Sequence, residues 1–487
     1  MSATEKDSAD GTAQQQAAEP VDDLVSTHHS ISTPGGELAY TATTGRIVLR
    51  EEVHEDGTFN GHKPKAELFL TSYVADAQPG RPVTFAFNGG PGSASVWLHL
   101  GLLGPRRVVS GDAGDLAAPP YELTDNAETL LAHSDLVFID PVSTGYSRAV
   151  EGGKPGDFHG FQGDIESVGE AIRLWTTRNG RWMSPKYLAG ESYGTLRAAA
   201  LAEHLQSRHG WYPNGLMLIS SVLDMGTIRF TEGNDLPYAL YLPTYAAIAH
   251  HHGKHGDRAL SDVLTEAEDF AATDYPWALA RGARLTEEQR TRIARRVADL
   301  TGLTEDYVLR ANLRIEHLRF FSELLRDRRL TTGRMDGRFT GWEPDAAAER
   351  FTDDPSISGI RGAYSAGINH YMREELGYRS DLPYETLSSR VHPWSYKEFE
   401  GSSVTAADRL AAAMRANPHL RVHVGSGRTD GATPYFAAEH TLAQLEIPQQ
   451  LHDNIDVRYY DAGHMMYVHD PSRRQQSADL AEFVAPR

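Results

Sequence analysis

The chain contains no cysteine among its 487 residues. This absence excludes disulfides and a thiolate nucleophile. Long apolar runs are also missing: no stretch of 18 consecutive apolar residues occurs, so we expect no membrane-spanning helix and no membrane partner. The first twenty residues lack the apolar segment of a secretory signal, which favours a cytoplasmic protein.

Basic residues are too few to balance the acids. Lys and Arg together number 47 against 66 Asp and Glu, for a net charge of −19. A chain this acidic, without any run of basic residues, is a poor ligand for polyanions, so we do not expect nucleic acid as a partner. The start of the chain is rich in Ala, Gln, Ser and acids, which predicts a disordered tail over residues 1–25.

Hydrophobic patterning predicts an α/β protein with a mostly parallel sheet. Residues 36–52 and 65–76 alternate apolar and polar side chains, as half-buried antiparallel strands do. Short continuous apolar runs follow at residues 83–87, 136–139, 186–190 and 215–220, typical of strands buried on both faces, and the α/β pattern returns at residues 421–427 and 455–463. Helical stretches separate them, such as 164–175, whose apolar residues form one stripe.

The middle of the chain reads differently. It is mostly helical, and Thr286 with Gln289 forms a capping box at the start of one helix. We therefore predict an α/β core in two parts with a helical cap inserted between them. The predicted boundaries are 1–25 for the tail, 26–224 for the first part of the core, 225–395 for the cap and 396–487 for the second part of the core.

The sequence GESYG places Ser192 between a predicted strand and a predicted helix. Gly190 and Gly194 flank it, as in the G-x-S-x-G turn that presents a nucleophilic serine. The alternative is a serine that only caps the helix, with glycines that permit tight packing.

A serine nucleophile needs a base and a group that orients the base. Asp430 and His464 each follow one of the last two predicted strands, in the order that α/β hydrolases use. Asp461 and His469 are the competing candidates. We favour Asp430 and His464 because open α/β sheets place their sites beyond the carboxyl ends of strands.

The glycine-rich stretch FNGGPGSASVW, residues 87–97, follows the strand at 83–87 directly. It lacks the Gly-Lys-Ser/Thr ending of a phosphate-binding loop. In a hydrolase such a loop brings backbone N–H groups to an oxyanion. A tight loop without any ligand is the alternative.

Together NGGPGSASVW, GESYG and GHMMYVHDP resemble the serine carboxypeptidases. The resemblance implies an α/β-hydrolase fold with a helical cap, in a bacterial-type cytoplasmic member without disulfides. It implies a peptidase that uses an acyl-enzyme intermediate and needs neither cofactor nor metal. The implied catalytic residues are Ser192, Asp430 and His464. The implied oxyanion hole consists of the backbone N–H groups of Gly90 and Tyr193, and the implied carboxylate-binding groups are Asn88, Gly89 and Glu191.

This resemblance explains why an acid precedes the nucleophile. An enzyme that removes the last residue must recognise a free carboxylate, and two contacting carboxyl groups share one proton. We expect Glu191 to hold that proton, with a bell-shaped pH profile on the acidic side of neutral. The alternative is that Glu191 merely fills a permissive position. Two residues depart from the family pattern: Ser93 replaces a cysteine, and Leu102 replaces an acid that often hydrogen-bonds the recognition glutamate.

Peptides with a free C-terminal carboxylate are the expected partners, and a homo-oligomer remains an option. An esterase or acyltransferase on the same scaffold is the second interpretation, and a non-catalytic binding protein is the third. The stretch GRMDGRFTG, residues 333–341, is interpreted as a glycine-rich turn with a solvated salt bridge, with a lid or substrate-side loop as the alternative.

Overall fold

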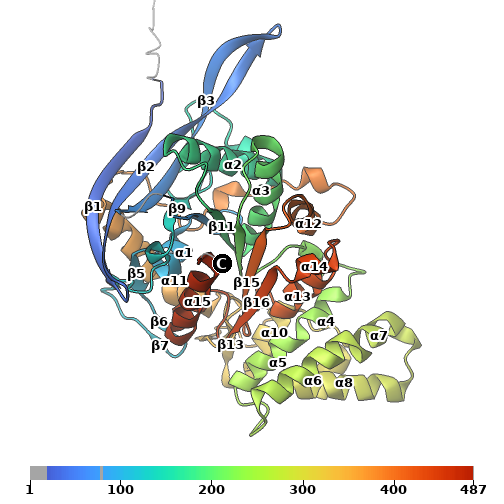
Figure 1. Ribbon diagram of the computed structural model, residues 1–487. Coiled ribbons are helices and arrows are strands. Elements are labelled where there is room, and N and C mark those ends of the chain that lie inside the picture. Colours follow the sequence, from blue (N-terminus) through green and yellow to red (C-terminus); the bar gives the residue numbers. More distant parts are fainter. Residues whose placement is uncertain (1–18, 77–79, 486–487) are drawn as a thin grey trace, which may run out of the picture.

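The protein is built on one large sheet whose antiparallel strands lie on one side and whose parallel strands extend to the opposite edge. The computed structural model describes residues 19–76 and 80–485. The strand order is β1-β2-β3-β9-β4-β11-β12-β15-β16, and the short β10 pairs with β3 (Figure 1). β1 to β3 are antiparallel, and the strands from β9 to β16 run parallel. Their bounds are β1 Asp23–Thr33, β2 Gly36–Glu55, β3 Thr58–Ala75, β4 Val83–Phe87, β9 Asp135–Ile139, β10 Arg148–Ala149, β11 Lys186–Glu191, β12 Gly215–Ile219, β15 Arg421–Gly427 and β16 Ile455–Tyr460.

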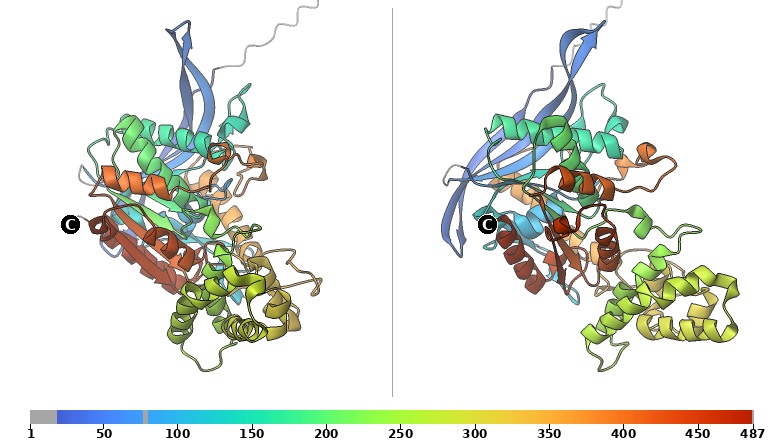
Figure 2. Two further views of the ribbon diagram at one scale, coloured as in Figure 1. Left: turned by 90° about the vertical axis from the view of Figure 1, so that its right-hand side faces the viewer. Right: turned by 45° about the vertical axis from the view of Figure 1, so that its right-hand side comes forward.

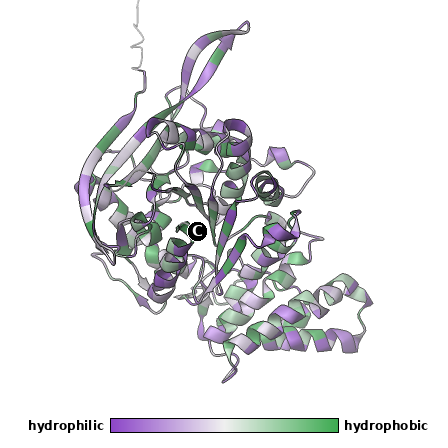
Figure 3. Cartoon of the chain, viewed as in Figure 1, coloured by the Kyte–Doolittle hydropathy of each residue, from purple (hydrophilic) through white to green (hydrophobic). Residues whose placement is uncertain are grey.

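Helices cover both faces of this sheet, so the apolar residues of the central strands are buried on both sides (Figure 3). One face packs against α2 (Phe161–Arg178), α3 (Tyr193–His209) and α12 (Ala407–Ala416). The other packs against α1 (Val96–Leu98), α11 (Pro355–His370) and α15 (Asp470–Val484). The predicted continuous apolar strands are confirmed, and the molecule has the α/β-hydrolase fold.

A group of helices between β12 and α11 forms its own apolar cluster and projects from one side of the body (Figure 2). The predicted capping box of Thr286 and Gln289 is present at the start of α8. The elements of this group are α4 Leu236–Leu240, α5 Leu242–His251, α6 Leu260–Ala272, α7 Asp274–Arg281, α8 Glu287–Thr301, α9 Glu305–Arg310, α10 His317–Glu323 and the hairpin of β13 (Leu330–Thr332) with β14 (Thr340–Trp342).

After α11 the chain returns across the core without long helices. It makes isolated strand bridges from Leu387 to Ser93 and from Glu385 to Gly145. The smaller elements are β5 Arg106–Val109, paired with β8 Glu122–Asp125; β6 Gly111–Asp112, paired with β7 Asp115–Leu116; and the helices α13 Tyr435–Ala443 and α14 Gln449–His452. Within the described residues no helix is long and apolar enough to cross a bilayer.

The predicted boundary of the disordered tail at residue 25 is wrong. Residues 1–18 lie outside the described residues, but 23–25 already belong to β1, where Asp23 pairs with Arg46. The preceding residue is also held, because Asp22 accepts a hydrogen bond from the backbone N–H of Val48. β1 is mostly exposed and polar, so backbone pairing along β2 orders it together with the few apolar contacts of Val25 and Ile31, and the composition gave no sign of it.

Candidate active site

Four loops meet at the carboxyl edge of the parallel strands, because parallel strands all end at the same side of a sheet. The glycine-rich loop follows β4, Ser192 follows β11, Asp430 follows β15 and His464 follows β16. The order of the strands thus collects residues that are far apart in the sequence.

Ser192 lies in a sharp turn between β11 and α3. Its φ of 61° and ψ of −129° are unusual for a residue with a side chain, and its N–H donates to the carbonyl of Ile219. A Cβ on Gly190 would lie 2.1 Å from the carbonyl oxygen of Gly194, so this crossing requires glycine. The turn therefore raises the serine above the sheet edge, as the G-x-S-x-G pattern predicts.

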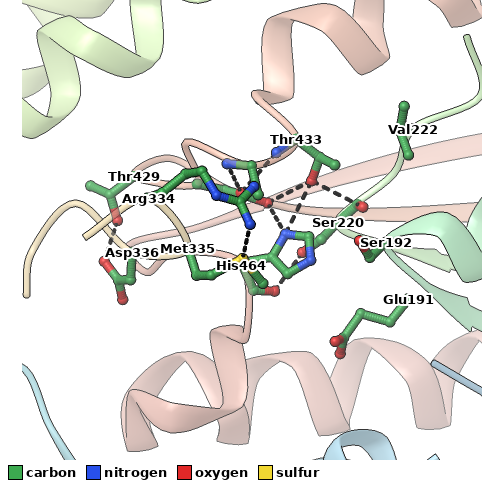
Figure 4. A network of polar contacts seen from close by, with 12 residues as sticks. Glu191, Ser192, Ser220, Val222, Arg334, Met335, Asp336, Thr429, Thr433 and His464 are labelled. Carbon is green, nitrogen blue, oxygen red and sulfur yellow. Dashed lines mark hydrogen bonds and ion pairs between the residues drawn. The ribbon is translucent and has the colours of Figure 1, made fainter. Parts of the chain in front are cut away.

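His464 and Asp430 form a buried pair, with Nδ1 of the imidazole 2.8 Å from Oδ2 of the carboxylate. Oδ1 of Asp430 accepts from the backbone N–H groups of Ala432 and Thr433. The carbonyl of His464 accepts from the hydroxyl of Ser220 at 2.6 Å. These contacts, drawn in Figure 4, fix the imidazole with Nδ1 toward the acid and Nε2 toward the cavity.

The second ring nitrogen of His464, Nε2, is available for another hydrogen bond. Nε2 of His464 is buried and has no hydrogen-bond partner among the described residues, while Ser192 and His464 line the same cavity. Burial acts to lower the pKa of His464, but the Asp430 carboxylate beside it outweighs burial and raises that pKa above its ordinary value. The ring is thus a stronger base than a free histidine.

Glu191 is also buried, with 3% of its surface exposed. Its Oε1 accepts from Nδ2 of Asn88 at 2.8 Å. Oδ1 of Asn88 accepts from the N–H of Leu98, which fixes the orientation of the amide and leaves one N–H of Nδ2 unused by these contacts. Burial raises the pKa of Glu191 to about 7, against the opposing effects of His464 and of the hydrogen bonds. Glu191 is therefore protonated in a large fraction of molecules at neutral pH.

Tyr467 is a site residue that the sequence interpretation missed. Its hydroxyl donates to Oε2 of Glu191 at 2.7 Å, and it lies three positions after His464. Leu102 occupies the position at which the family often has an acid, and it is buried in the apolar core. In this chain the hydroxyl of Tyr467 therefore contacts Glu191, and the acid of the family pattern is absent. The only signal in the sequence was the presence of a tyrosine in the stretch GHMMYVHDP, which also contains His464.

The glycine-rich loop lies against the beginning of α3. A Cβ on Gly89 would come within 2.5 Å of the backbone nitrogen of Tyr193, so the two segments touch through their backbones. Arg197 of α3 holds the loop by donating to the carbonyl of Asn88, and it pairs with Asp164 at 2.7 Å. Both side chains of this pair are only 1% exposed. Sequence reasoning did not identify this anchor.

All eight predicted site residues line one cavity except Asp430, which lies behind His464. The volume of this cavity is about 630 Å³, and its apolar wall includes Val222, Met225 and Ile228. The competing candidates lie elsewhere. Asp461 is largely exposed and pairs with Arg428, and His469 contacts the hydroxyl of Ser472 at the start of α15.

The interpretation of residues 333–341 as a turn with a solvated salt bridge is wrong. Asp336 is 5% exposed, pairs with Arg338 at 2.6 Å and accepts from the hydroxyl of Thr429. The carbonyl of Met335 accepts from the backbone N–H of His464. The loop therefore packs against both loops that carry Asp430 and His464 (Figure 4). Its glycines allow this close approach rather than an exposed turn: a Cβ on Gly337 would meet the side chain of Ile248.

Comparison with known families agrees with this geometry. Residues 52–215 match the family described as serine carboxypeptidase. The chain is similar in part to the serine carboxypeptidases. The match contains the glycine-rich loop and the Ser192 turn, whereas Asp430 and His464 lie outside it and are brought in by the fold.

Among curated proteins, Serine carboxypeptidase-like 36 of Arabidopsis thaliana is 30% identical over 152 residues. That segment is 30% of this chain and spans only 30% of the length of the relative. Among solved structures, proline iminopeptidase of Mycobacterium smegmatis is 14% identical, with 90% of this chain and 97% of that chain covered and a TM-score of 0.35. A lipase in its open form is also 14% identical, with 90% and 98% covered and a TM-score of 0.34.

Proposed function

We propose that the protein is a serine-type carboxypeptidase that removes C-terminal residues from peptides. The observation that carries this proposal is the buried Glu191 beside Ser192, held by Asn88 and Tyr467 and half protonated near neutral pH. A hydrolase that binds neutral or internal substrates gains nothing from a desolvated acid at this position. An enzyme that must hold a carboxylate next to its nucleophile gains a hydrogen-bond donor.

The proposed clamp uses three groups. Protonated Glu191 donates its O–H to one oxygen of the substrate carboxylate, and the second N–H of Asn88 and the N–H of Gly89 donate as well. Only the protonated acid can do this, because an ionised glutamate would repel the substrate. The raised pKa of Glu191 therefore supports the clamp.

The proposed reaction has two steps. In the first, Oγ of Ser192 attacks the last peptide carbonyl while Nε2 of His464 takes its proton; the carbonyl oxygen becomes an oxyanion that the N–H groups of Gly90 and Tyr193 stabilise. The C–N bond then breaks, and His464 gives its proton to the leaving amine. In the second step water, deprotonated by His464, attacks the acyl carbon. The bond from that carbon to Oγ of Ser192 then breaks, the shortened peptide leaves with a new C-terminal carboxyl group, and His464 returns its proton to Ser192. Asp430 orients the imidazole throughout and stabilises its charged form.

The second candidate is an esterase or acyltransferase on the same scaffold. The apolar wall of the cavity favours it, because Val222, Met225 and Ile228 could hold an acyl chain. In that reaction an alcohol would replace the amine as leaving group or acceptor. Glu191 would then have no carboxylate to bind, so this candidate leaves the clamp unexplained.

The two functions are separated by substrates that differ in one group. We expect an N-blocked dipeptide with a free carboxylate to be hydrolysed with a kcat/KM at least ~100-fold above that of its C-terminal amide, the scale of losing charge-assisted hydrogen bonds. The Ser192→Ala variant should hydrolyse neither. Equal rates on acid and amide, or turnover confined to short-chain esters, would favour the second candidate.

A further inference from the structure

Two arginines enter the cavity without an acidic partner in the part of the chain that the structure describes. Arg334, from the loop after β13, and Arg361, on α11, both line it. No other Arg or Lys lines the cavity, and neither of these two forms an ion pair within residues 19–76 and 80–485. Their neighbour Arg338 shows the contrast, because it pairs with both Asp336 and Asp112. The two unpaired guanidinium groups need a separate explanation.

The side chain of Arg334 extends from the cap loop toward the His464 loop (Figure 4). Its one side-chain hydrogen bond among the described residues is from Nη2 to the sulfur of Met335 at 3.3 Å. A thioether is a weak acceptor, whereas a guanidinium carries five N–H donors in a fork that matches a carboxylate. Arg334 is half-buried, so it is partly removed from water before any ligand binds.

Arg361 approaches the same cavity from α11. Three residues further along this helix, Tyr364 packs on Trp97 with ring centroids 4.8 Å apart, and Trp97 is itself a wall of the cavity. This packing fixes the helix beside the glycine-rich loop. Arg361 is exposed, so it can bind an anionic group that remains near the mouth of the cavity.

The charges of the cavity point to an anionic ligand. Its lining contains one acid, Glu191, beside the two arginines, and Asp430 is satisfied by His464 behind the wall. The whole chain carries a net charge of −19 and repels anions at long range. A locally positive cavity in an acidic protein therefore selects for anions that bind there through direct contacts.

We propose that Arg334 and Arg361 bind an acidic side chain of the substrate, so that the enzyme prefers peptides with Glu or Asp next to the scissile bond. This inference rests on the proposed carboxypeptidase function and assigns its substrate class. The arginines could instead bind the α-carboxylate at the C-terminus of the peptide. The experiment must therefore distinguish binding of the side-chain carboxylate from binding of the α-carboxylate.

The test uses N-blocked peptides in matched pairs, with Glu or Gln either as the last residue or as the one before it. In the wild type we expect kcat/KM for Glu to exceed that for Gln at one of the two positions by on the order of 10- to 100-fold, the range of a charge-assisted hydrogen bond. The ratio should fall toward one in Arg334→Gln and Arg361→Gln. Arg350→Gln, which removes an exposed cap arginine outside the cavity, should keep it.

A charge reversal at Arg334 gives a result that a merely structural role of this residue would not produce. Arg334→Glu should hydrolyse peptides with Lys at the same position faster than the wild type does. A wild-type ratio of one, or a ratio that survives in both Gln variants, would overturn the proposal. So would an equal loss on Glu and Gln peptides, because the arginines would then bind the α-carboxylate.

Failure of this inference differs from failure of the proposed function. If free-acid peptides are trimmed but Glu and Gln are equivalent, only the arginine assignment is overturned. If the peptides and their C-terminal amides are cleaved equally or not at all, the carboxypeptidase function itself fails.

Discussion

Replacing Tyr467 by Phe should broaden the pH range of the enzyme rather than narrow it. The hydroxyl of Tyr467 donates to Oε2 of Glu191 at 2.7 Å, and a donor of this kind stabilises the ionised acid. A hydrogen bond to a charged group is worth about 1.5–3 kcal/mol, and 1.36 kcal/mol corresponds to one pKa unit. Starting from a pKa of about 7, Tyr467→Phe should raise the pKa of Glu191 by about one to two units.

The sign for activity follows from the proposed clamp. It exists only while Glu191 is protonated, so kcat/KM for free-acid peptides is full below the pKa of Glu191 and is lost as pH rises through it. The acid limb belongs to His464, which must lose a proton to act as base and whose pKa is raised. The wild type should therefore show a narrow bell near neutral pH, less acidic than the sequence suggested.

The assay is kcat/KM for one free-acid peptide between pH 5 and pH 9. At about pH 8 a pKa rise from about 7 to about 8 increases the protonated fraction of Glu191 about fivefold, and the activity of Tyr467→Phe relative to its own maximum should rise accordingly. Tyr364→Phe is the matched control, because Tyr364 is a buried neighbour with no hydrogen bond to Glu191 among the described contacts. An alkaline limb of Tyr467→Phe that coincides with the wild type, or moves to lower pH, would refute this reasoning.

Three further outcomes are expected. Ser192→Ala should lower kcat by on the order of 10³- to 10⁶-fold with unchanged melting temperature, and Asp430→Asn should lower it less; residual activity above a tenth of wild type would rule out Ser192 as nucleophile. Glu191→Gln should keep more activity than Glu191→Ala and should lack the alkaline limb; coinciding wild-type and Gln profiles would argue against the clamp. Arg197→Met should lower the free energy of unfolding by about 3–5 kcal/mol in denaturant titrations, because it leaves a buried acid unpaired, whereas Arg173→Met, which breaks a partly exposed pair, should cost under about 1 kcal/mol. Equal effects of the two Arg variants would contradict the anchoring role.

The sequence predicted the central strands and the turn around Ser192 well because they depend on local patterns. Runs such as 83–87 are buried at every position since helices cover both faces of the sheet. Gly190 is required by a backbone contact within the turn itself, with the carbonyl oxygen of Gly194. Asp430 and His464 could be placed because parallel strands end at one edge, whatever their distance in the sequence.

Contacts between distant segments could not be predicted in this way. β1 is polar and is ordered by pairing with β2, which no local pattern reveals. Tyr467 contacts Glu191 across 276 positions, and the loop at 333–338 is buried only because the cap folds back onto the His464 loop. A motif can indicate which residues act, but the partners that tune their pKa values come from tertiary packing.

The most direct test is to digest a peptide of about ten residues and its C-terminal amide side by side and to follow both by mass spectrometry. The proposed function predicts a ladder of products from the free acid, each shorter by one C-terminal residue, with the amide essentially intact and no ladder from Ser192→Ala. Internal cleavage, or equal trimming of acid and amide, would contradict the assignment of Glu191 as the group that recognises the substrate carboxylate.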